Sequence, residues 1–403
     1  MPVNLDVIPD KAPGIVRPRT RRWLLFLPFM LLAGATSTLW FWKNEHTGIA
    51  FWFTAIGLPA AIWGILFSLR RIGYKCDQIW ATSWNRERDQ LIEDETQRGQ
   101  RYLCWHGGVS FTTVGKSTEK LLSAVLKNTP LMSSVIPRTG GFAVRHTRLG
   151  STTNTIPAVL QEWHGHLKQR ISALLDTLPA GMPCYVLLDT HIDQDPQVNA
   201  KHAQEVMAMF SRPLRQINGA GFVALDQWID ITWGIPSALL VIGTQINNRP
   251  EINSGEAATA MLLTNCPMPD ERKTVRIHRP ECGTNAALTK TLSRALLWTN
   301  VQPVSVGQAW LTGGALLTDS EWSTACEKTA LGLDIQKQCR VIDNITGFTG
   351  CTAPWLALLM AATQCREDGI TQAVTVQTAT DKIWVGCVSA PASEIKDIQD
   401  TSL

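Results

Sequence analysis

The chain has 403 residues, of which 45% are apolar and only 18% are charged, and its formal net charge is +3. This length suffices for one large domain or two medium ones with appendages, and a charge so close to balance excludes a strongly basic nucleic-acid-binding surface. The ten cysteines stand singly with no CxxC pair, so neither a zinc ribbon nor a small disulfide-stapled secreted protein fits. Free thiols in a reducing compartment are the simpler interpretation.

Two uncharged apolar stretches lie near the N-terminus, at residues 23–42 and 47–69. Each is about as long as the roughly 20 residues that cross a bilayer core, and tryptophans flank one end of the pair, as a membrane interface favours. We therefore predict a tail over residues 1–22 and a two-span transmembrane hairpin over residues 23–69. The alternative, two buried core helices of a soluble protein, is disfavoured because core helices are seldom apolar all round.

Basic residues set the expected orientation of this hairpin. They cluster at its two outer ends: Arg17, Arg19, Arg21, Arg22, Arg70, Arg71 and Lys75. The short connection "KNEH" carries one lysine and one glutamate. The positive-inside rule then places both ends in the cytoplasm. We expect a multi-pass protein of a bacterial inner membrane with its soluble domain in the cytoplasm.

A charged segment follows the second span, over residues 70–101. Ile79, Trp80, Trp84 and Leu91 can form one apolar stripe, while arginines and glutamates make a solvated face. Gly99 is the expected C-terminal stop. We predict a juxtamembrane charged helix that packs on the next domain.

Strand-like and helix-like segments alternate from residue 102 to residue 403. The expected strands include "LCWHGGVSFTTV", "CYVLLD", "SALLVIGTQI" and "EAATAMLLTN". The expected helices include "STEKLLSAVLKN", "TIPAVLQEWHGHLKQRISALLDTL" and "APWLALLMAATQCRE", and "AVTVQTATDKIWVGCVSA" is typical of a closing hairpin. This alternation predicts an α/β domain with a central sheet. No short-period internal repeat is visible.

The motif "GKS" at residues 115–117 invites comparison with a phosphate-binding loop. That loop requires a glycine five residues before the motif, and this position is Ser110. We therefore expect Ser117 to cap a helix, and we predict no nucleotide cofactor.

Histidines and aspartates cluster in two other places. His164 and His166 stand two apart in "WHGH", so on a helix they point in different directions and cannot share a metal; we expect a surface pair. Four titratable residues follow one another in "LLDTHIDQDP": Asp189, His191, Asp193 and Asp195. Functional residues of α/β folds commonly lie at strand ends, which favours a site here. Asp-rich sequences also occur in ordinary turns, which is the alternative interpretation. We predict no metal site.

Three stretches, in the right order, resemble the thiolase-like fold of ketoacyl synthases. "ALLVIG" followed by "SGEAATAMLL" resembles the strand pair that links the two halves of that fold. "WLTGGALLTDSE" stands where the family carries its HGTGT–GD–E element, and "DNITGFTGCTAPWLALLMA" resembles the NIGHT element that opens a helix. The resemblance implies a thiolase-like α/β domain over residues 102–403, with halves over about 102–265 and 266–403.

The residues that carry out the family's chemistry are replaced in this sequence. The histidine of the third element falls on Phe348 and the lysine on Asp343, while the histidine of the second falls near Trp310 or Leu311. The segment before "ALLVIG" has no cysteine where the nucleophile would stand. Cys351 is expected to be a buried packing residue. Because condensation needs a thiolate and oxyanion-stabilising donors, these losses predict a pseudoenzyme with no catalytic residue.

The overall plan of the chain resembles the type VI secretion lipase-adapter family. The basis of this resemblance is the stretch "WNRERDQLIEDETQRGQR", which precedes the α/β body. That family carries phospholipase effectors to the secretion spike. The resemblance implies a non-catalytic membrane-anchored adapter whose partners are a secreted effector, the spike or envelope-complex components, and which can form a homo-oligomer. Two competing hypotheses are a membrane-bound acyl-transfer or lipid-modifying enzyme of the ketoacyl-synthase-like class, using Cys351 or Asp189 with His191, and a purely structural subunit of an envelope complex.

Overall fold

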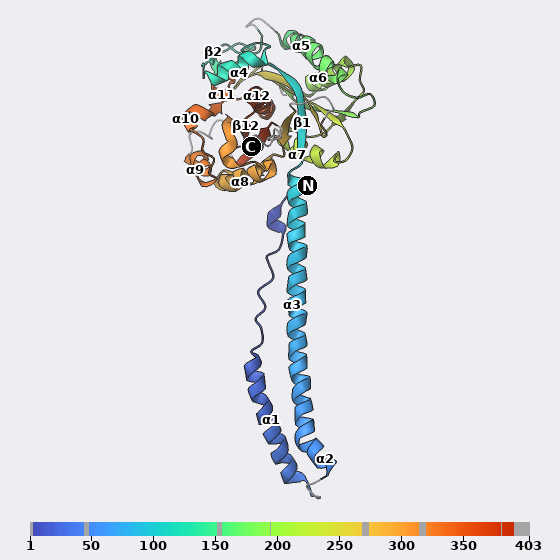
Figure 1. The fold of residues 1–403 in the computed structure, drawn as a ribbon. Coiled ribbons are helices and arrows are strands. Elements are labelled where there is room, and N and C mark those ends of the chain that lie inside the picture. Colours follow the sequence, from blue (N-terminus) through green and yellow to red (C-terminus); the bar gives the residue numbers. More distant parts are fainter. Residues whose placement is uncertain are drawn as a thin grey trace, which may run out of the picture. The chain divides into compact units, whose positions relative to one another are not determined.

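The computed structural model describes residues 3–43, 48–150, 155–193, 195–267, 274–313, 320–379 and 381–390 (Figure 1). The chain divides into two compact units, a smaller one over Asn4–Glu95 and a larger one formed by Met1–Val3 and Thr96–Leu403. Most of the predicted connection "KNEH" and residues 314–319 of the second ketoacyl-synthase-like element lie outside the described residues.

The smaller unit is built of helices. They are the 3-10 turn η1 Leu5–Val7, α1 Thr20–Phe41, α2 Ile49–Trp52, the π-helical turn η2 Phe53–Gly57 and α3 Leu58–Gly99. Both α1 and the helical stretch that begins at Ile49 are long and apolar enough to cross a membrane. Gly34 lets α1 approach the second stretch closely, because an added Cβ would lie 2.1 Å from Pro59. The sequence prediction of two apolar helices is confirmed.

The charged segment predicted over residues 70–101 is helical as far as Gly99. It is the continuation of α3, which runs unbroken from its apolar beginning to Gly99. No proline follows Pro59 within this helix, so no residue interrupts its backbone hydrogen bonds. The predicted stop at Gly99 is confirmed.

The larger unit contains one mixed sheet, in the order β11-β10-β12-β13-β8-β1-β7-β6-β4-β5, with β9 paired to β13. Its strands are β1 Tyr102–Phe111, β4 Cys184–Ile192, β5 Leu214–Ile217, β6 Ala238–Ile246, β7 Ala257–Thr264, β8 Val275–His278, β9 Glu281–Gly283, β10 Val306–Thr312, β11 Cys339–Val341, β12 Thr371–Ala379 and β13 Lys382–Ser389. A separate hairpin joins β2 Ser133–Val135 to β3 Val144–His146.

One strand pattern occurs twice in this sheet. In the first set β5, β4 and β6 are parallel, β7 is antiparallel to β6, and β1 is antiparallel to β7. In the second set β11, β10 and β12 are parallel, β13 is antiparallel to β12, and β8 is antiparallel to β13. The antiparallel pair β1–β8 joins the two sets. The α/β class predicted from the sequence is confirmed, although the duplication leaves no visible sequence repeat.

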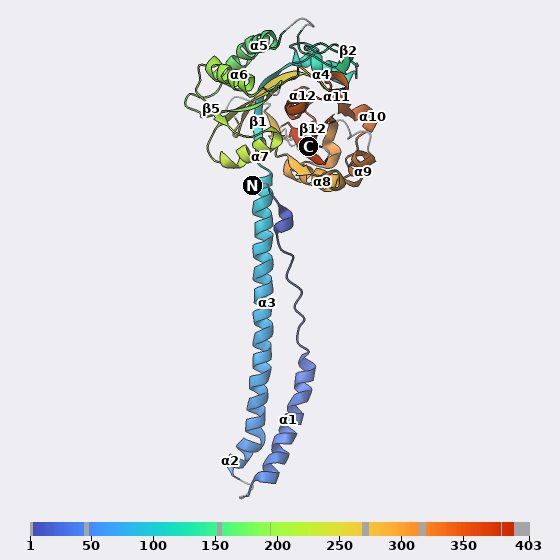
Figure 2. The same cartoon turned by 180° about the vertical axis from the view of Figure 1, so that it is seen from behind.

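Helices cover both faces of the sheet (Figures 1 and 2). They are α4 Thr118–Leu126, α5 Ile156–Asp176, α6 Pro196–Met209, α7 Gly221–Ile231, α8 Leu288–Thr299, α9 Ser320–Lys328, α10 Ile335–Gln338, α11 Asp343–Thr346 and α12 Ala353–Asp368, with 3-10 turns η3 Asn285–Ala287, η4 Pro303–Ser305 and η5 Gly350–Thr352. Along β6, Leu239 and Val241 pack with α7 and α12, whereas Leu240 and Ile242 pack with α5. This alternation follows from the period of two in a strand. Ser117 caps α4 by accepting from the Lys120 N–H at 3.2 Å, as predicted.

A buried charge cluster holds the last turn of α3. Asp230 on α7 binds Arg98 at 2.7 Å, Arg101 at 2.9 Å and also Arg279. Arg279 is 1% exposed and binds Asp226 at 2.8 Å. Burial by itself would raise the pKa of Asp230, but the hydrogen bonds from Arg98 and Arg279 outweigh it and hold that pKa at about 2.

We predict that Asp230→Asn lowers the free energy of unfolding by about 2–3 kcal/mol, because three guanidinium groups lose the charge of this carboxylate. The loss stays below that of an orphaned buried charge, since the buried Arg279 keeps its ion pair with Asp226. Since the pKa of Asp230 is depressed in the folded state from 3.8, this stabilisation is present above about pH 4 and is lost as the pH falls towards 2. Chemical denaturation at several pH values measures it. The control is Glu162→Gln in the exposed pair with Lys116, expected to cost less than about 1 kcal/mol. Equal losses in the two variants would contradict the prediction.

Candidate functional site

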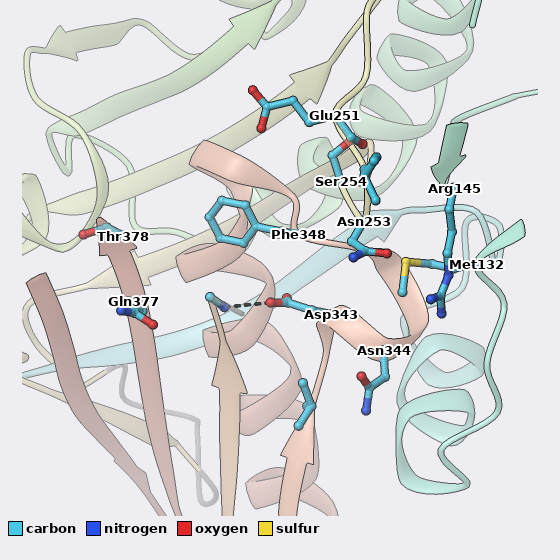
Figure 3. Close-up of a pocket in the computed structure, with 13 residues that line it drawn as sticks. Met132, Arg145, Glu251, Asn253, Ser254, Asp343, Asn344, Phe348, Gln377 and Thr378 are labelled. Atoms are coloured by element: carbon cyan, nitrogen blue, oxygen red, sulfur yellow. Dashed lines mark hydrogen bonds between the residues drawn. The ribbon is translucent and has the colours of Figure 1, made fainter. Parts of the chain in front are cut away.

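The candidate site is a pocket of about 600 Å³ at the carboxyl ends of three parallel strands (Figure 3). β10 leads into Gly313, β11 leads into Asp343, and β12 contributes Gln377. The connection between β6 and β7 supplies another wall at residues 251–254. Open α/β sheets place ligands at this edge, because loops from several strands converge there.

Asp343 supplies a carboxylate to this pocket. Its Oδ1 accepts a hydrogen bond from the Thr312 hydroxyl at 2.6 Å. Its Oδ2 accepts one from the Gly313 N–H at 2.7 Å, which is the dashed line in Figure 3. Two donors on different oxygens fix the plane of the carboxylate. An acidic group therefore stands, well oriented, where the resemblance places a lysine.

Phe348 forms a wall of the pocket, where the resemblance places a histidine. Its N–H donates to the Asn253 carbonyl at 2.9 Å, and its own carbonyl accepts from the Gly255 N–H at 2.8 Å. The preceding residue, Gly347, has a φ of 66°, and an added Cβ there would lie 2.3 Å from the Ser254 carbonyl oxygen. Only glycine fits this close approach, so the backbone that carries Phe348 is fixed against the β6–β7 connection.

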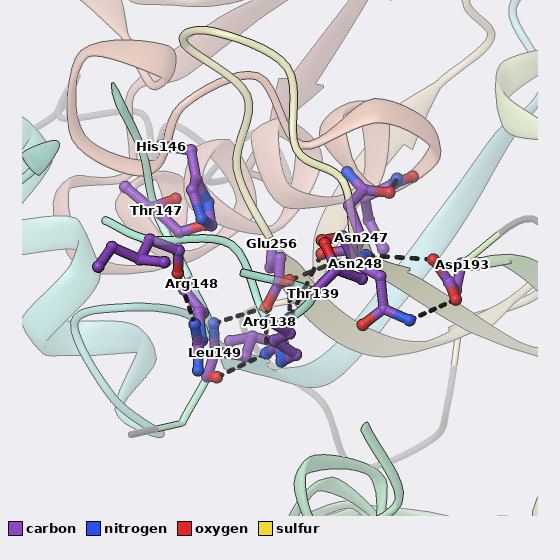
Figure 4. Close-up of polar contacts among 12 residues, drawn as sticks. Arg138, Thr139, His146, Thr147, Arg148, Leu149, Asp193, Asn247, Asn248 and Glu256 are labelled. Atoms are coloured by element: carbon purple, nitrogen blue, oxygen red, sulfur yellow. Dashed lines mark hydrogen bonds and ion pairs between the residues drawn. The ribbon is translucent and has the colours of Figure 1, made fainter. Parts of the chain in front are cut away.

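The buried carboxylate of Glu256 anchors the β6–β7 connection through its hydrogen bonds (Figure 4). Glu256 is 1% exposed and binds both terminal nitrogens of Arg138, one of them at 2.8 Å. It also accepts from the N–H groups of Leu149 at 2.9 Å and Asn247 at 3.2 Å. Four donors thus converge on one carboxylate, and they hold the segment 138–149 against the wall of the pocket.

The structure brings together two groups that the sequence offered as separate candidates. The Cys351 Sγ lies 3.4 Å from the backbone oxygen of Asp189 and 3.3 Å from the Gln245 Oε1. The Asp189 carboxylate accepts from the Trp355 Nε1–H at 2.8 Å and from the N–H of Gly221, the first residue of α7, at 2.7 Å. Neither Cys351 nor Asp189 is among the residues that line the 600 Å³ pocket.

Both of these groups titrate away from their ordinary ranges. Burial raises the pKa of the Cys351 thiol, and the neighbouring Asp189 carboxylate raises it further. Burial also raises the pKa of Asp189, against the opposing effect of its hydrogen bonds from Trp355 and Gly221. A thiol whose pKa is raised is protonated at neutral pH and is a weak nucleophile.

The other residues of "LLDTHIDQDP" lie apart from this cluster. Asp193 accepts from the backbone N–H of Asn248 at 3.2 Å, and Asp195 caps the N-terminus of α6. Among the described residues, no hydrogen bond joins Asp189 to His191. These aspartates have the roles of ordinary turn and cap residues.

The prediction that His164 and His166 form a pair on the surface is wrong. His166 is buried, and His164 is hydrogen-bonded to the buried His202 on α6 at 2.8 Å. Residues two apart on a helix point in different directions, as argued from the sequence, but α5 is covered on both of these sides. The partner His202 lies too far along the chain for spacing to have indicated it.

Trp310 and Leu311 are core residues of β10. Both side chains are buried, and the Trp310 Nε1–H donates to the Gln372 Oε1 at 3.1 Å. The position at which the resemblance expects a second histidine is therefore filled by hydrophobic packing.

No protein-family model and no curated protein sequence matches the chain. Among solved structures it is similar to the ketosynthase from module 1 of the bacillaene synthase of Bacillus amyloliquefaciens FZB42, with 9% identity, a TM-score of 0.54, and coverage of 73% of this chain and 77% of that one. An oxazolomycin ketosynthase domain from Streptomyces albus JA3453 has 11% identity, a TM-score of 0.53, and coverage of 72% and 75%. The ishigamide ketosynthase/chain length factor has 13% identity, a TM-score of 0.50, and coverage of 72% and 99%.

These comparisons confirm the thiolase-like fold expected from the sequence. They contradict the prediction of a non-enzymatic domain, because the shared fold is one that ketosynthases use. That prediction took the loss of one family's nucleophile and histidines as the loss of all chemistry, whereas an oriented carboxylate remains at the same edge of the sheet. The three structures are not secretion-system components, and the adapter role stays a prediction.

We predict that Glu256→Gln lowers the free energy of unfolding by about 3–5 kcal/mol, because the buried Arg138 guanidinium loses its counter-charge. Hydrogen exchange should accelerate in peptides covering residues 138–149 and 251–256, with α12 as the internal reference. Wild-type stability and unchanged exchange in these peptides would contradict the prediction.

Cys351 should react with N-ethylmaleimide at pH 7 at least about tenfold more slowly than the exposed Cys282, because Cys351 is only partly accessible and the pKa of its thiol is raised. Mass spectrometry of digests taken over time measures both rates in the folded protein. Labelling of Cys351 as fast as that of Cys282 would show a reactive thiol and reverse the assignment.

Proposed function

We propose that this chain is a membrane-anchored acyl-transfer or lipid-modifying enzyme of the ketosynthase-like class. The observation that carries the proposal is the pocket of about 600 Å³ at the carboxyl ends of β10, β11 and β12, with the Asp343 carboxylate oriented in it. The ketosynthase-like fold supports the same class of substrate, an acyl group. The two apolar helices support a site of action at a membrane.

The walls of the pocket suit an acyl ester or thioester. Phe348, Val341 and Met132 offer apolar surface to an acyl chain, while Asn253 and Asn344 offer amide groups to a carbonyl. Binding sites for small molecules commonly combine such an apolar lining with a few polar groups that fix orientation.

Asp343 is the group that we assign to proton transfer. In the proposed step the hydroxyl oxygen of an acceptor attacks the acyl carbonyl carbon, and Asp343 takes the hydroxyl proton. The bond from the carbonyl carbon to the leaving oxygen or sulfur then breaks, and the proton passes to that leaving atom. A positioned general base of this kind typically contributes about 10²–10⁴-fold in rate. The step needs no enzyme thiol, which agrees with the protonated state of Cys351.

The test uses the full chain in phospholipid nanodiscs with octanoyl- and palmitoyl-coenzyme A, and follows acylated products by mass spectrometry. Asp343→Asn should lower the turnover rate by about 10²-fold or more while acyl binding persists, because the Thr312 hydroxyl can turn to accept from the new amide. Asn344→Trp should abolish acyl binding by filling the pocket from an exposed position. Ser323→Trp, on an exposed position of α9, is the matched control and should retain wild-type binding.

Acyl binding that Asn344→Trp leaves unchanged would contradict the proposed site. Turnover that survives in Asp343→Asn would contradict the role of the carboxylate. If no acyl compound binds and a secreted effector co-purifies with the chain instead, the adapter role is the better account.

A further inference from the structure

A second pocket, of about 570 Å³, lies between α5 and α6 in the first half of the larger unit. Its apolar lining comes from both helices, with Leu160 on α5 and Val198 on α6. His164, His202 and Glu205 line the same cavity, and neither the acyl pocket nor the Asp189 cluster includes them. The pocket thus combines apolar walls with a group of titratable side chains that the proposed reaction does not use.

These polar groups form a chain with one consistent direction. The His164 Nε2 lies 2.8 Å from the His202 Nδ1, and the His164 Nδ1 lies 3.5 Å from a Glu205 carboxylate oxygen. Burial lowers the pKa of His202 to about 3 and also lowers that of His164, so both rings are neutral at neutral pH. Each ring then has one N–H, and the nearby Glu205 carboxylate, which can only accept, favours the tautomer that carries this N–H on the His164 Nδ1. His202 therefore donates to His164, and its Nε2 faces the Thr244 hydroxyl at 3.5 Å.

This arrangement determines what the pocket can offer to a ligand. The two imidazoles are hydrogen-bonded to each other, and the carboxylate of Glu205, whose side chain is 45% exposed, is the acceptor that the pocket can offer to a ligand. The charged residues of the lining are Asp193, Glu205 and Lys201, a net charge of −1 with the histidines neutral. Lys201 is 78% exposed and only 3.9 Å from Glu205, a weak pair that a bound cation can replace.

We propose that this pocket is a second ligand site that binds a small monocation with an apolar body, such as an arylalkylamine. The ammonium group donates to Glu205, and the apolar body packs between Leu160 on α5 and Val198 on α6. The His164–His202 pair lies beside Glu205, with the His164 Nδ1 3.5 Å from its carboxylate. This site stands on its own geometry and does not depend on the acyl-transfer proposal.

The test is calorimetric titration of the full chain in nanodiscs with three matched probes: 3-phenylpropan-1-amine, 3-phenylpropan-1-ol and 3-phenylpropionate. The amine should bind most tightly and the carboxylate most weakly, because the pocket presents an acceptor with net negative charge. Glu205→Gln should weaken amine binding roughly tenfold or more, since a charged hydrogen bond is lost. Lys201→Gln, one turn earlier on the same helix, removes the opposite charge and should leave amine binding unchanged or stronger.

Gln161→Trp provides a second variant, because it fills the mouth of the pocket from an exposed position and should abolish binding of the amine. Circular dichroism and thermal unfolding confirm that each variant is folded. Equal affinities for the three probes, no detectable amine binding, or equal effects of Glu205→Gln and Lys201→Gln would each overturn the proposal.

Discussion

The 600 Å³ pocket depends on one buried ion pair, between Glu256 and Arg138. The pair sits at the start of β7, behind the connection whose other side lines the pocket. The same connection is bonded through its backbone to Thr147, which donates to the Ser254 carbonyl at 3.2 Å and accepts from the Glu256 N–H at 3.0 Å. A carboxylate buried this deeply persists only where its lone pairs are satisfied, so the ion pair fixes the connection. Backbone hydrogen bonds then join this connection to Phe348 in the second half.

Two carboxylates in this fold have opposite environments, and the contrast indicates where chemistry can occur. Asp189 is buried beneath α7 and Trp355, beside a protonated thiol, and lines neither pocket described above. Asp343 is oriented by Thr312 and Gly313 and opens into the 600 Å³ cavity. The first arrangement stabilises the start of α7, whereas the second presents a proton acceptor to a ligand. Under the proposed function, the carboxylate of Asp343 takes the place at this edge of the sheet that the resemblance gives to a lysine.

The sequence predicts the elements whose signal is local. The apolar helix α12, the cap at Ser117 and the helical end at Gly99 each follow from a short stretch of residues. The duplicated sheet has no local signal, because the two strand sets share topology without sharing sequence. The contact of Cys351 with Asp189 and that of His164 with His202 are also hidden, since they join residues 162 and 38 positions apart. The prediction of a pseudoenzyme was wrong because it tested the sequence only against the chemistry of one family.

The central claim is that an acyl group occupies the pocket beside Phe348 rather than only contacting the apolar helices. Photo-crosslinking tests it directly, with a diazirine-tagged octanoyl thioester added to the full chain in nanodiscs and the labelled peptides mapped by mass spectrometry. We expect labels on residues 251–254 and 341–348, and expect that untagged octanoyl thioester competes them away. Labels confined to residues 20–69, unchanged by the competitor, would contradict the account.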